Sequence, residues 1–224
     1  MNVNISQQLI EYEQARSNCY KLLAACFYQP QKEIFMEEGL FENLTVLLKQ
    51  ACPDAVVFSE KMGRAILNYN NEDLLIDYAK LFVGPYELKA APYGSIYLDE
   101  GRKIMGDSTI EVIKIYKDEG LSIDENFKEL PDHIAVELEF MYYLIFKEVE
   151  ALEKSETDKA LNFIKTQELF LDKFLKKWVG PFCDKIKQGT DNEFYSSLAD
   201  CLSVFIEKAH ARNELPEALK VKTA

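Results

Sequence analysis

The sequence predicts an all-α protein, and three observations support this fold class. Apolar residues recur at steps of three, four and seven along most of the chain, which is the spacing of one helix face. Alternating patterns long enough for a β-strand are absent, and glycine, proline and capping residues separate the periodic segments. With 224 residues, 48% of them hydrophobic, the chain can bury one large core. We therefore expect a single domain of about ten or more helices over residues 1–212, followed by a flexible tail at 213–224.

Four helices are expected in the first half of the chain. The first ends before Pro30, because its apolar residues keep helical spacing up to that point and proline cannot continue a helix. The other three are expected at about residues 35–50, 55–67 and 72–82. The last of these ends at Gly84-Pro85, since glycine accepts the left-handed conformation of a helix cap.

Residues 84–101 read GPYELKAAPYGSIYLDEG and interrupt the helical pattern. They contain two prolines, three glycines and three tyrosines, with little periodicity. Such a run is an ordered loop if its aromatic side chains pack, or a linker if they do not. Tyr93 and Tyr97 combine apolar area with a polar tip, which suits a recognition surface as well as packing onto the helices.

The helices resume with recognisable start signals. Ser108 and Glu111 form a capping box for a helix that stops at Gly120, and Pro131 fits the first position of the next helix. That next helix is the most apolar of the chain, so we expect it to lie at the centre of the fold. Its apolar stripe consists of Ile134, Leu138, Met141 and Ile145.

Two long helices complete the expected fold. One runs from about residue 155 to 179 and is stopped by Gly180-Pro181. Thr190 and Glu193 form a second capping box, which opens the last helix.

The composition narrows the classes of function. A net charge of −12 disfavours nucleic acid and anionic membranes as partners, whereas it attracts a basic peptide. No stretch approaches the roughly 20 uncharged apolar residues of a membrane helix, so we expect a cytoplasmic protein without stable membrane insertion. The five cysteines match no zinc or redox spacing, and we expect buried, reduced thiols.

His133 is the histidine with acidic neighbours, since Asp132 lies beside it and Glu129 one turn upstream. A charged histidine is disfavoured at a helix start, so His133 is expected to be neutral. The simplest interpretation is that Asp132 caps the helix and His133 packs or hydrogen-bonds locally. A catalytic pair is disfavoured, because adjacent helical residues point about 100° apart.

Other signatures of catalysis are missing. The sequence has no GxSxG nucleophile motif and no phosphate-binding glycine loop, and its two histidines make a poor metal site. We therefore expect no catalytic residue, no metal and no cofactor. Two alternatives stay open: a small helical hydrolase or nucleotide-binding protein that uses Asp132 and His133, and a plain helical scaffold.

Three motifs occur in a fixed order. They are YAKLFVGP at 78–85, APYGSIY at 91–97 and ELPDH at 129–133. Together they resemble the elements Y-x-x-L-F-x-G-P, P-P-W-G-S-V-Y and E-P-x-D-H of the TorD/DmsD family of molybdoenzyme chaperones, which has the NarJ type among its relatives. Tyr93 stands where tryptophan is common, and Leu130-Pro131 replaces the usual Pro-x.

The resemblance implies a TorD-like helical fold and a cytoplasmic chaperone. Such a chaperone binds the twin-arginine leader and the immature catalytic subunit of a molybdopterin oxidoreductase, prevents premature export and assists cofactor insertion. A NarJ-like chaperone of a non-exported molybdoenzyme is the alternative within the family. The resemblance leaves open a contact with the export machinery, and it allows either a monomer or a domain-swapped dimer.

The resemblance also implies a set of leader-binding residues. A leader with a basic stretch and an apolar stretch needs an aromatic groove with acidic groups at one end. Tyr93 and Tyr97 would supply the aromatic part, and Glu129 and Asp132 the acidic part. The full implied set is Tyr78, Phe82, Pro92, Tyr93, Gly94, Ser95, Tyr97, Glu129, Asp132 and His133.

Overall fold

The computed structural model describes residues 2–85, 88–101, 103–122 and 128–211, and within them the predicted all-α fold is confirmed. In this part of the chain the regular elements are helical, and β-type pairing is limited to an isolated antiparallel bridge between Tyr93 and His133. No helix in these residues is long and apolar enough to cross a membrane. The tail expected at 213–224 lies outside the described residues.

The α-helices are numbered in chain order. They are α1 (Asn2–Ala25), α2 (Lys32–Glu37), α3 (Leu40–Ala51), α4 (Val56–Ala65), α5 (Asn71–Tyr78), α6 (Ser95–Leu98), α7 (Asp107–Asp118), α8 (Ile134–Glu153), α9 (Thr157–Phe170), α10 (Lys176–Gly189) and α11 (Glu193–Ala211). Short 3₁₀ turns lie at Pro53–Ala55 and Ile66–Asn68, and π-helical turns at Ala79–Val83 and Leu171–Leu175.

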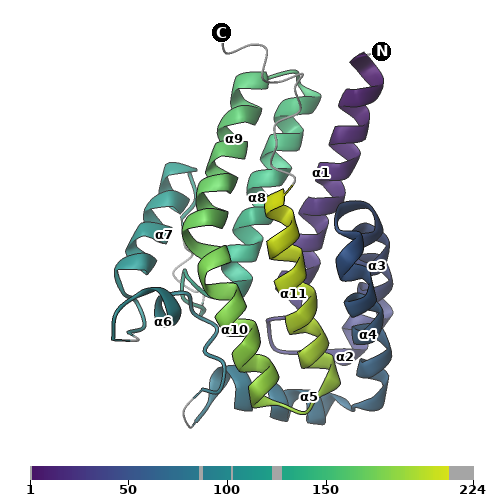
Figure 1. The fold of residues 1–224 in the computed structure, drawn as a ribbon, viewed down its shortest axis with the longest axis vertical. Helices are drawn as coiled ribbons and strands as arrows, with labels where there is room; N and C mark the ends of the chain where they lie inside the picture. Colours follow the sequence, from purple (N-terminus) through teal and green to yellow (C-terminus); the bar gives the residue numbers. More distant parts are fainter. Residues whose placement is uncertain (1, 86–87, 102, 123–127, 212–224) are drawn as a thin grey trace.

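The most apolar helix, α8, lies inside the bundle as predicted. Figure 1 shows α1 on one side of α8 and α9 on the other, with α3 and α4 beyond α1 and with α6 and α7 on the opposite flank. Helices α10 and α11 pack against each other, and α5 lies across the lower end of the bundle. A continuous buried cluster joins these helices, and its largest members are Trp178, Tyr20, Tyr195, Phe27, Phe41, Phe170, Phe174, Phe182, Phe194 and Phe205.

The predicted stop at Gly180-Pro181 is wrong. After the π-helical turn the chain continues as α10, and Pro181 lies inside this helix. Proline inside a helix costs about 3 kcal/mol, because it removes a backbone hydrogen bond. The neighbouring Trp178 and Phe182 are fully buried, and burying each such side chain contributes about 1.5–3 kcal/mol, which offsets that cost. By contrast, the predicted stop at Gly84 is confirmed by its left-handed φ of 96°.

The two predicted capping boxes are also wrong. Helix α7 begins at Asp107, and the backbone N–H and hydroxyl of Ser108 donate to the Asp99 carboxylate, which comes from the preceding loop. Thr190 accepts from the N–H of Asn192 at 3.0 Å, and the Asn192 side chain accepts from the N–H of Phe194. In both places another side chain accepts the hydrogen bond of a free helix N–H group: the Asp99 carboxylate at the start of α7 and the Asn192 amide oxygen at the start of α11.

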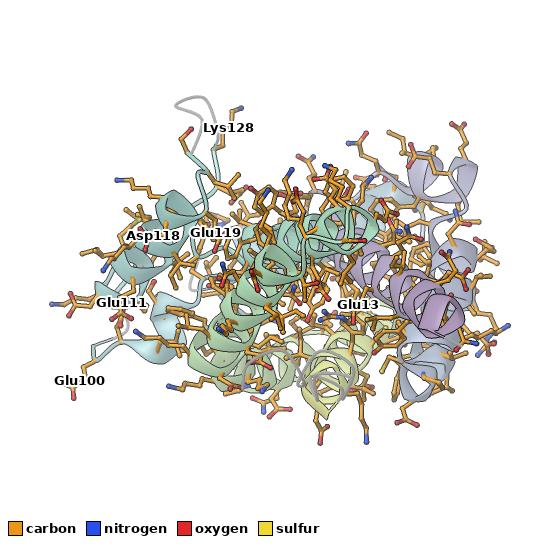
Figure 2. The ribbon with its side chains drawn as sticks, turned by 90° about the horizontal axis from the view of Figure 1, so that it is seen from above. Glu13, Glu100, Glu111, Asp118, Glu119 and Lys128 are labelled. Atoms are coloured by element: carbon orange, nitrogen blue, oxygen red, sulfur yellow. The ribbon has the colours of Figure 1, made fainter. Side chains whose placement is uncertain are left out.

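A buried polar network joins α1, α8 and α9. The Arg16 guanidinium donates to the Glu13 carboxylate at 2.6 Å and to the side-chain amide oxygen of Gln167 at 2.6 Å, and the Gln167 amide nitrogen donates to the Glu148 carboxyl at 2.7 Å. Glu13 lies among the helices, whereas Glu100 and Glu111 point outward at the edge of the molecule (Figure 2). Burial raises the pKa of Glu148 to about 8. The hydrogen bonds of the network compensate for burying these ionisable side chains, since an ionised side chain buried without a partner would lower the stability of the fold.

Candidate functional site

Two of the three motifs are joined directly by backbone hydrogen bonds. The N–H of Gly94 donates to the carbonyl of Asp132 at 2.8 Å, and the N–H of Ile134 donates to the carbonyl of Pro92 at 2.8 Å. These bonds flank the bridge between Tyr93 and His133. The aromatic loop is therefore ordered where it crosses the start of α8, which is the first of the two alternatives open for residues 84–101.

Asp132 accepts a hydrogen bond from the start of α6 and not from α8, the helix that it was expected to cap. Helix α8 begins at Ile134, so Pro131 does not occupy its first position. The Asp132 carboxylate accepts from the N–H of Ser95 at 2.8 Å, at the N-terminus of α6, and is 1% exposed. The expectation that Asp132 caps α8 is therefore wrong. As a buried group, Asp132 holds the loop in place and presents no acidic surface.

His133 caps α8 instead. Its Nδ1 accepts from the N–H of Ala135 at 3.2 Å, so the hydrogen of a neutral ring lies on Nε2, 3.8 Å from a Glu129 oxygen. Burial lowers the pKa of His133 to about 4, which agrees with the prediction of a neutral ring. Asp132 and His133 thus have separate partners, and nothing orients the two side chains as a catalytic pair.

Two tyrosine rings cover His133 from the surface side. The Tyr28 ring stacks on the imidazole with a centroid distance of 6.2 Å, and the Tyr93 ring meets it edge-on at 5.5 Å. The Glu139 carboxylate lies beside Tyr28, and burial together with this carboxylate raises the pKa of Tyr28. Tyr28 and Glu139 were not predicted, since the sequence gives no sign that the end of α1 and the first turns of α8 meet here.

We call Tyr28, Tyr93, Glu129 and Glu139 the acidic tyrosine face. All four are partly or fully accessible, and His133 lies beneath them. Partial burial raises the pKa of Glu129 and of Glu139 above the usual value, but neither carboxylate has a cationic partner among the described residues. The face therefore offers negative charge beside aromatic rings.

Tyr78 and Phe82, from the first motif, lie under this region. The Tyr78 hydroxyl donates to the carbonyl of Phe27 at 3.3 Å, and burial with Glu129 nearby raises the pKa of Tyr78 to about 12. The Phe82 ring is buried and contacts Phe27, Tyr78, Phe182 and Tyr195. These two residues support the site from within.

Gly94 lies in a tightly packed position. A Cβ atom at this position would lie 3.2 Å from the Glu137 Oε1 and 3.2 Å from the Trp178 Nε1. The Trp178 N–H donates to Glu137 at 2.9 Å, and burial holds the pKa of Glu137 well above its usual range. Pro92 and Ser95 are buried beside this contact. Pro92, Gly94 and Ser95 are therefore packed inside the protein and do not form part of an exposed binding surface.

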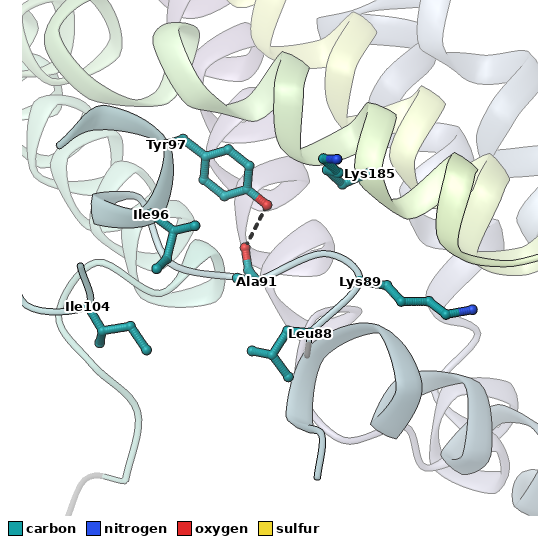
Figure 3. Close-up of a pocket in the computed structure, with 7 residues that line it drawn as sticks. All are labelled: Leu88, Lys89, Ala91, Ile96, Tyr97, Ile104 and Lys185. Carbon is teal, nitrogen blue, oxygen red and sulfur yellow. Dashed lines mark hydrogen bonds between the residues drawn. The ribbon is translucent and has the colours of Figure 1, made fainter. Parts of the chain in front are cut away.

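Tyr97 does not join Tyr93. Its ring stacks on Trp178 at 5.5 Å and meets the ring of Phe182, and its hydroxyl donates to the carbonyl of Ala91 at 2.9 Å. It borders a groove of about 430 Å³, and the charged side chains that line this groove in the described part of the chain are Lys89 and Lys185 (Figure 3). The structure thus brings Tyr78, Tyr93, Glu129, Asp132 and His133 together, and places Tyr97 against a different surface.

Metal ligands and thiols complete the description of the residues that the structure covers. In the part of the chain that the structure describes, no group of three or more His, Cys, Asp or Glu side chains could hold a metal ion. The five cysteines are buried and free, as predicted, and burial raises the pKa of Cys19, Cys26, Cys183 and Cys201.

Comparison with known proteins identifies the family. The family model of the nitrate reductase delta subunit matches residues 47–184, and the chain belongs to this family. Chaperone protein TorD of Vibrio parahaemolyticus is 33% identical over 133 residues, which cover 59% of this chain and 60% of that protein. Chaperone protein TorD of Vibrio vulnificus strain YJ016 is 24% identical over 214 residues, or 89% of this chain and 94% of that protein. The resemblance to the TorD/DmsD family is thereby confirmed.

The extent of these matches differs between relatives. The chain spans about three fifths of the length of the V. parahaemolyticus protein and of Chaperone protein TorD of Photobacterium profundum, to which it is 29% identical over 136 residues. A solved structure, named as that of a redox enzyme maturation protein from Archaeoglobus fulgidus, matches 86% of this chain and 93% of its own with a TM-score of 0.47 and 21% identity. The curated relatives are named chaperones and not enzymes.

Proposed function

We propose that this protein is a cytoplasmic chaperone of molybdoenzyme maturation, without catalysis of its own, that binds the twin-arginine leader of its client at the acidic tyrosine face. The observation that carries the proposal is the arrangement around His133. The centroids of two partly exposed tyrosine rings lie within 6.2 Å of the imidazole centroid, a Glu129 oxygen lies 3.8 Å from the imidazole Nε2, and the Glu139 carboxylate lies beside Tyr28.

The charge of this face suits the basic part of a leader. Arginine guanidinium groups bind carboxylates through paired hydrogen bonds and also stack on aromatic rings. Glu129 and Glu139 can accept the hydrogen bonds, while Tyr28 and Tyr93 offer ring faces. The net charge of −12 adds a general attraction for a basic peptide.

A place for the apolar part of the leader lies further along α8. Tyr142 and Phe146 follow Glu139 by three and seven residues, so they share its side of the helix. With Gln14 and Asn18 of α1 they line a groove of about 410 Å³ between the two helices, which Figure 1 shows side by side. Phe146 is 46% exposed, which leaves apolar area for a partner to cover.

The same proposal includes the wider role of the protein. Binding would hide the leader from the export machinery until the molybdenum cofactor is inserted into the catalytic subunit. We propose one helical domain over residues 1–212, acting as a monomer or a domain-swapped dimer, with no nucleic-acid partner. If the client is not exported, the same face would hold a remnant leader, as in a NarJ-like chaperone.

Calorimetric titration tests this proposal. The protein is titrated at two salt concentrations with leader peptides of the molybdoreductases encoded in the same genome, and the variants Glu129→Gln, Glu139→Gln and Tyr93→Ala are measured beside it. Glu100→Gln is the matched control, because Glu100 is exposed at the edge of the molecule (Figure 2) and loses the same charge.

The expected result is binding to one leader that weakens with salt and weakens about fivefold in each of the three variants, but not in the control. Equal affinity of the leader for the wild type and all three variants would show that the leader does not bind at the acidic tyrosine face. Absence of binding to every leader, and to the catalytic subunits that carry them, would overturn the proposed function.

A further inference from the structure

A second groove is lined by other side chains of the same loop. It lies between residues 88–98, the segment around Ile104 and helix α10, and has a volume of about 430 Å³ (Figure 3). We call it the lysine groove. Its lining residues are Leu88, Lys89, Ala91, Ile96, Tyr97, Ile104 and Lys185.

The lining leaves apolar area open to solvent. Ile104 is 50% exposed, and so is Met105 beside it, while Leu88 and Ile96 are half-buried. Clusters of accessible apolar side chains with a polar rim are typical of interaction surfaces. These residues make no contribution to the acidic tyrosine face, so the proposed leader site does not explain their exposure.

Lys89 is held in place by the end of α10. Its ammonium donates to the carbonyl of Gly189 at 2.9 Å. Its aliphatic stem is packed so closely that a Cβ atom on Gly189 would lie 3.0 Å from the Lys89 Cβ. Lys89 thus caps the C-terminal end of α10.

Lys185 has a different environment. It lies on α10 one turn before the end of the helix and is exposed, and among the residues that the structure describes it forms no ion pair. The neighbouring Lys187 contrasts with it, because Lys187 pairs with both Asp184 and Asp200. A lysine near a helix C-terminus is favoured by the helix dipole, which accounts for its charge but not for the apolar groove around it.

The sign of the charge is the informative feature. The chain carries 38 acidic and 26 basic residues, yet among the described residues the charged side chains that line this groove are both lysines. A twin-arginine leader would be repelled there. A segment that places carboxylates beside apolar side chains would be attracted.

We propose that the lysine groove is a second docking site, which takes an acidic, apolar segment of a partner protein. The apolar side chains of that segment pack on Leu88, Ile96 and Ile104, and a carboxylate pairs with Lys185. This inference is independent of the leader site and survives if the leader binds elsewhere.

A displayed library of short random peptides provides the test. Peptides are selected on the full-length wild-type protein and then sorted by whether they still bind Lys185→Glu and Lys177→Glu. Lys177 is the matched control, since it lies exposed on the same helix outside the groove and its reversal changes the net charge equally. The affinity of the best peptide is then measured by fluorescence anisotropy for both variants and for Ile96→Ser, with thermal unfolding to verify folding.

The expected peptides carry Asp or Glu next to apolar residues, lose about tenfold in affinity on Lys185→Glu and keep it on Lys177→Glu. Selection of basic peptides, of no peptides, or of peptides that bind all variants equally would overturn the inference. Titration of a leader peptide into Lys185→Glu separates the two proposals. If acidic peptides fail while the leader binds, only this inference falls, and the reverse result removes only the proposed function.

Discussion

Tyr93 and Tyr97 lie four residues apart in one loop and belong to two surfaces of opposite charge. Tyr93 packs on His133 beside Glu129, whereas Tyr97 packs on Trp178 and borders a groove with Lys89 and Lys185. The loop can serve both surfaces because it is fastened in the middle, where the backbone and carboxylate of Asp132 hold Gly94 and Ser95. One rigid loop can therefore present two kinds of binding surface.

The largest expected difference between the two surfaces is in their response to acid. The acidic tyrosine face rests on a buried imidazole, and the lysine groove does not. The folded-state pKa of His133, about 4, lies below its ordinary value of 6.5, so the unfolded chain takes up a proton first as the pH falls. The stability that His133 contributes is therefore complete above pH 6.5 and is lost as the pH falls toward about 4. Its size is about 3 kcal/mol.

The variant His133→Asn tests this difference. Asparagine keeps an acceptor for the helix cap and removes the titrating group. We expect the difference in free energy of unfolding between wild type and variant, measured by urea denaturation, to shift by about 3 kcal/mol against the wild type between neutral pH and about pH 4. The difference is the right quantity, because buried carboxyls such as Glu148, whose raised pKa has the opposite effect, cancel in it. A constant difference across that range would contradict a buried neutral ring.

The next effect acts on both surfaces at once. Gly94→Val places carbon atoms against Glu137 and Trp178, where a Cβ already lies 3.2 Å from both. Overpacking of this kind costs about 1–3 kcal/mol. We expect the free energy of unfolding to fall by that amount and the affinities at both surfaces to fall together.

Gly180→Ala is the control for this substitution. A Cβ at Gly180 has no neighbour within 4 Å, and the residue lies inside α10. Alanine there should raise the free energy of unfolding by up to about 1 kcal/mol, because it favours the helix. Equal stability of Gly94→Val and the wild type would show that the loop does not pack as closely as described.

The smallest expected effect separates the two lysines of the groove. Lys89→Met removes the hydrogen bond to the carbonyl of Gly189 while keeping the stem, and should lower the free energy of unfolding by about 0.5–1 kcal/mol. Lys185→Met should leave it within about 0.5 kcal/mol, because Lys185 has no ion pair among the described residues. Urea denaturation of both variants measures this, and a larger loss for Lys185→Met would assign that lysine a structural role.

Most of the fold could be predicted from the sequence, because helix formation depends mainly on residues that are close together in the chain. Spacing or residue type predicts three features: the apolar stripe of α8, the end of the α5 segment at Gly84, and the buried thiols. The continuation through Pro181 could not be predicted, since it depends on the burial of Trp178 and Phe182 in a core assembled from distant segments.

The site was predictable in its residues but not in its arrangement. Asp132 is a good helix cap by residue type, but its carboxylate bonds to Ser95, 37 residues away in the chain, and His133 caps α8 instead. Tyr28 lies in the turn after α1 and Glu139 lies in α8, and no local sequence pattern predicts that these two segments meet. A motif names the residues, while long-range packing decides which of them reach the surface.

The most direct test of the account compares one twin-arginine leader on two charge-reversed proteins, Glu129→Lys and Lys185→Glu. Each reversal changes one side chain, on the acidic tyrosine face or in the lysine groove, and calorimetric titration gives the affinity. The account predicts a loss of about tenfold or more for Glu129→Lys and an unchanged or slightly higher affinity for Lys185→Glu. An unchanged affinity for Glu129→Lys, or an equal loss for Lys185→Glu, would contradict the assignment of the leader to the acidic tyrosine face.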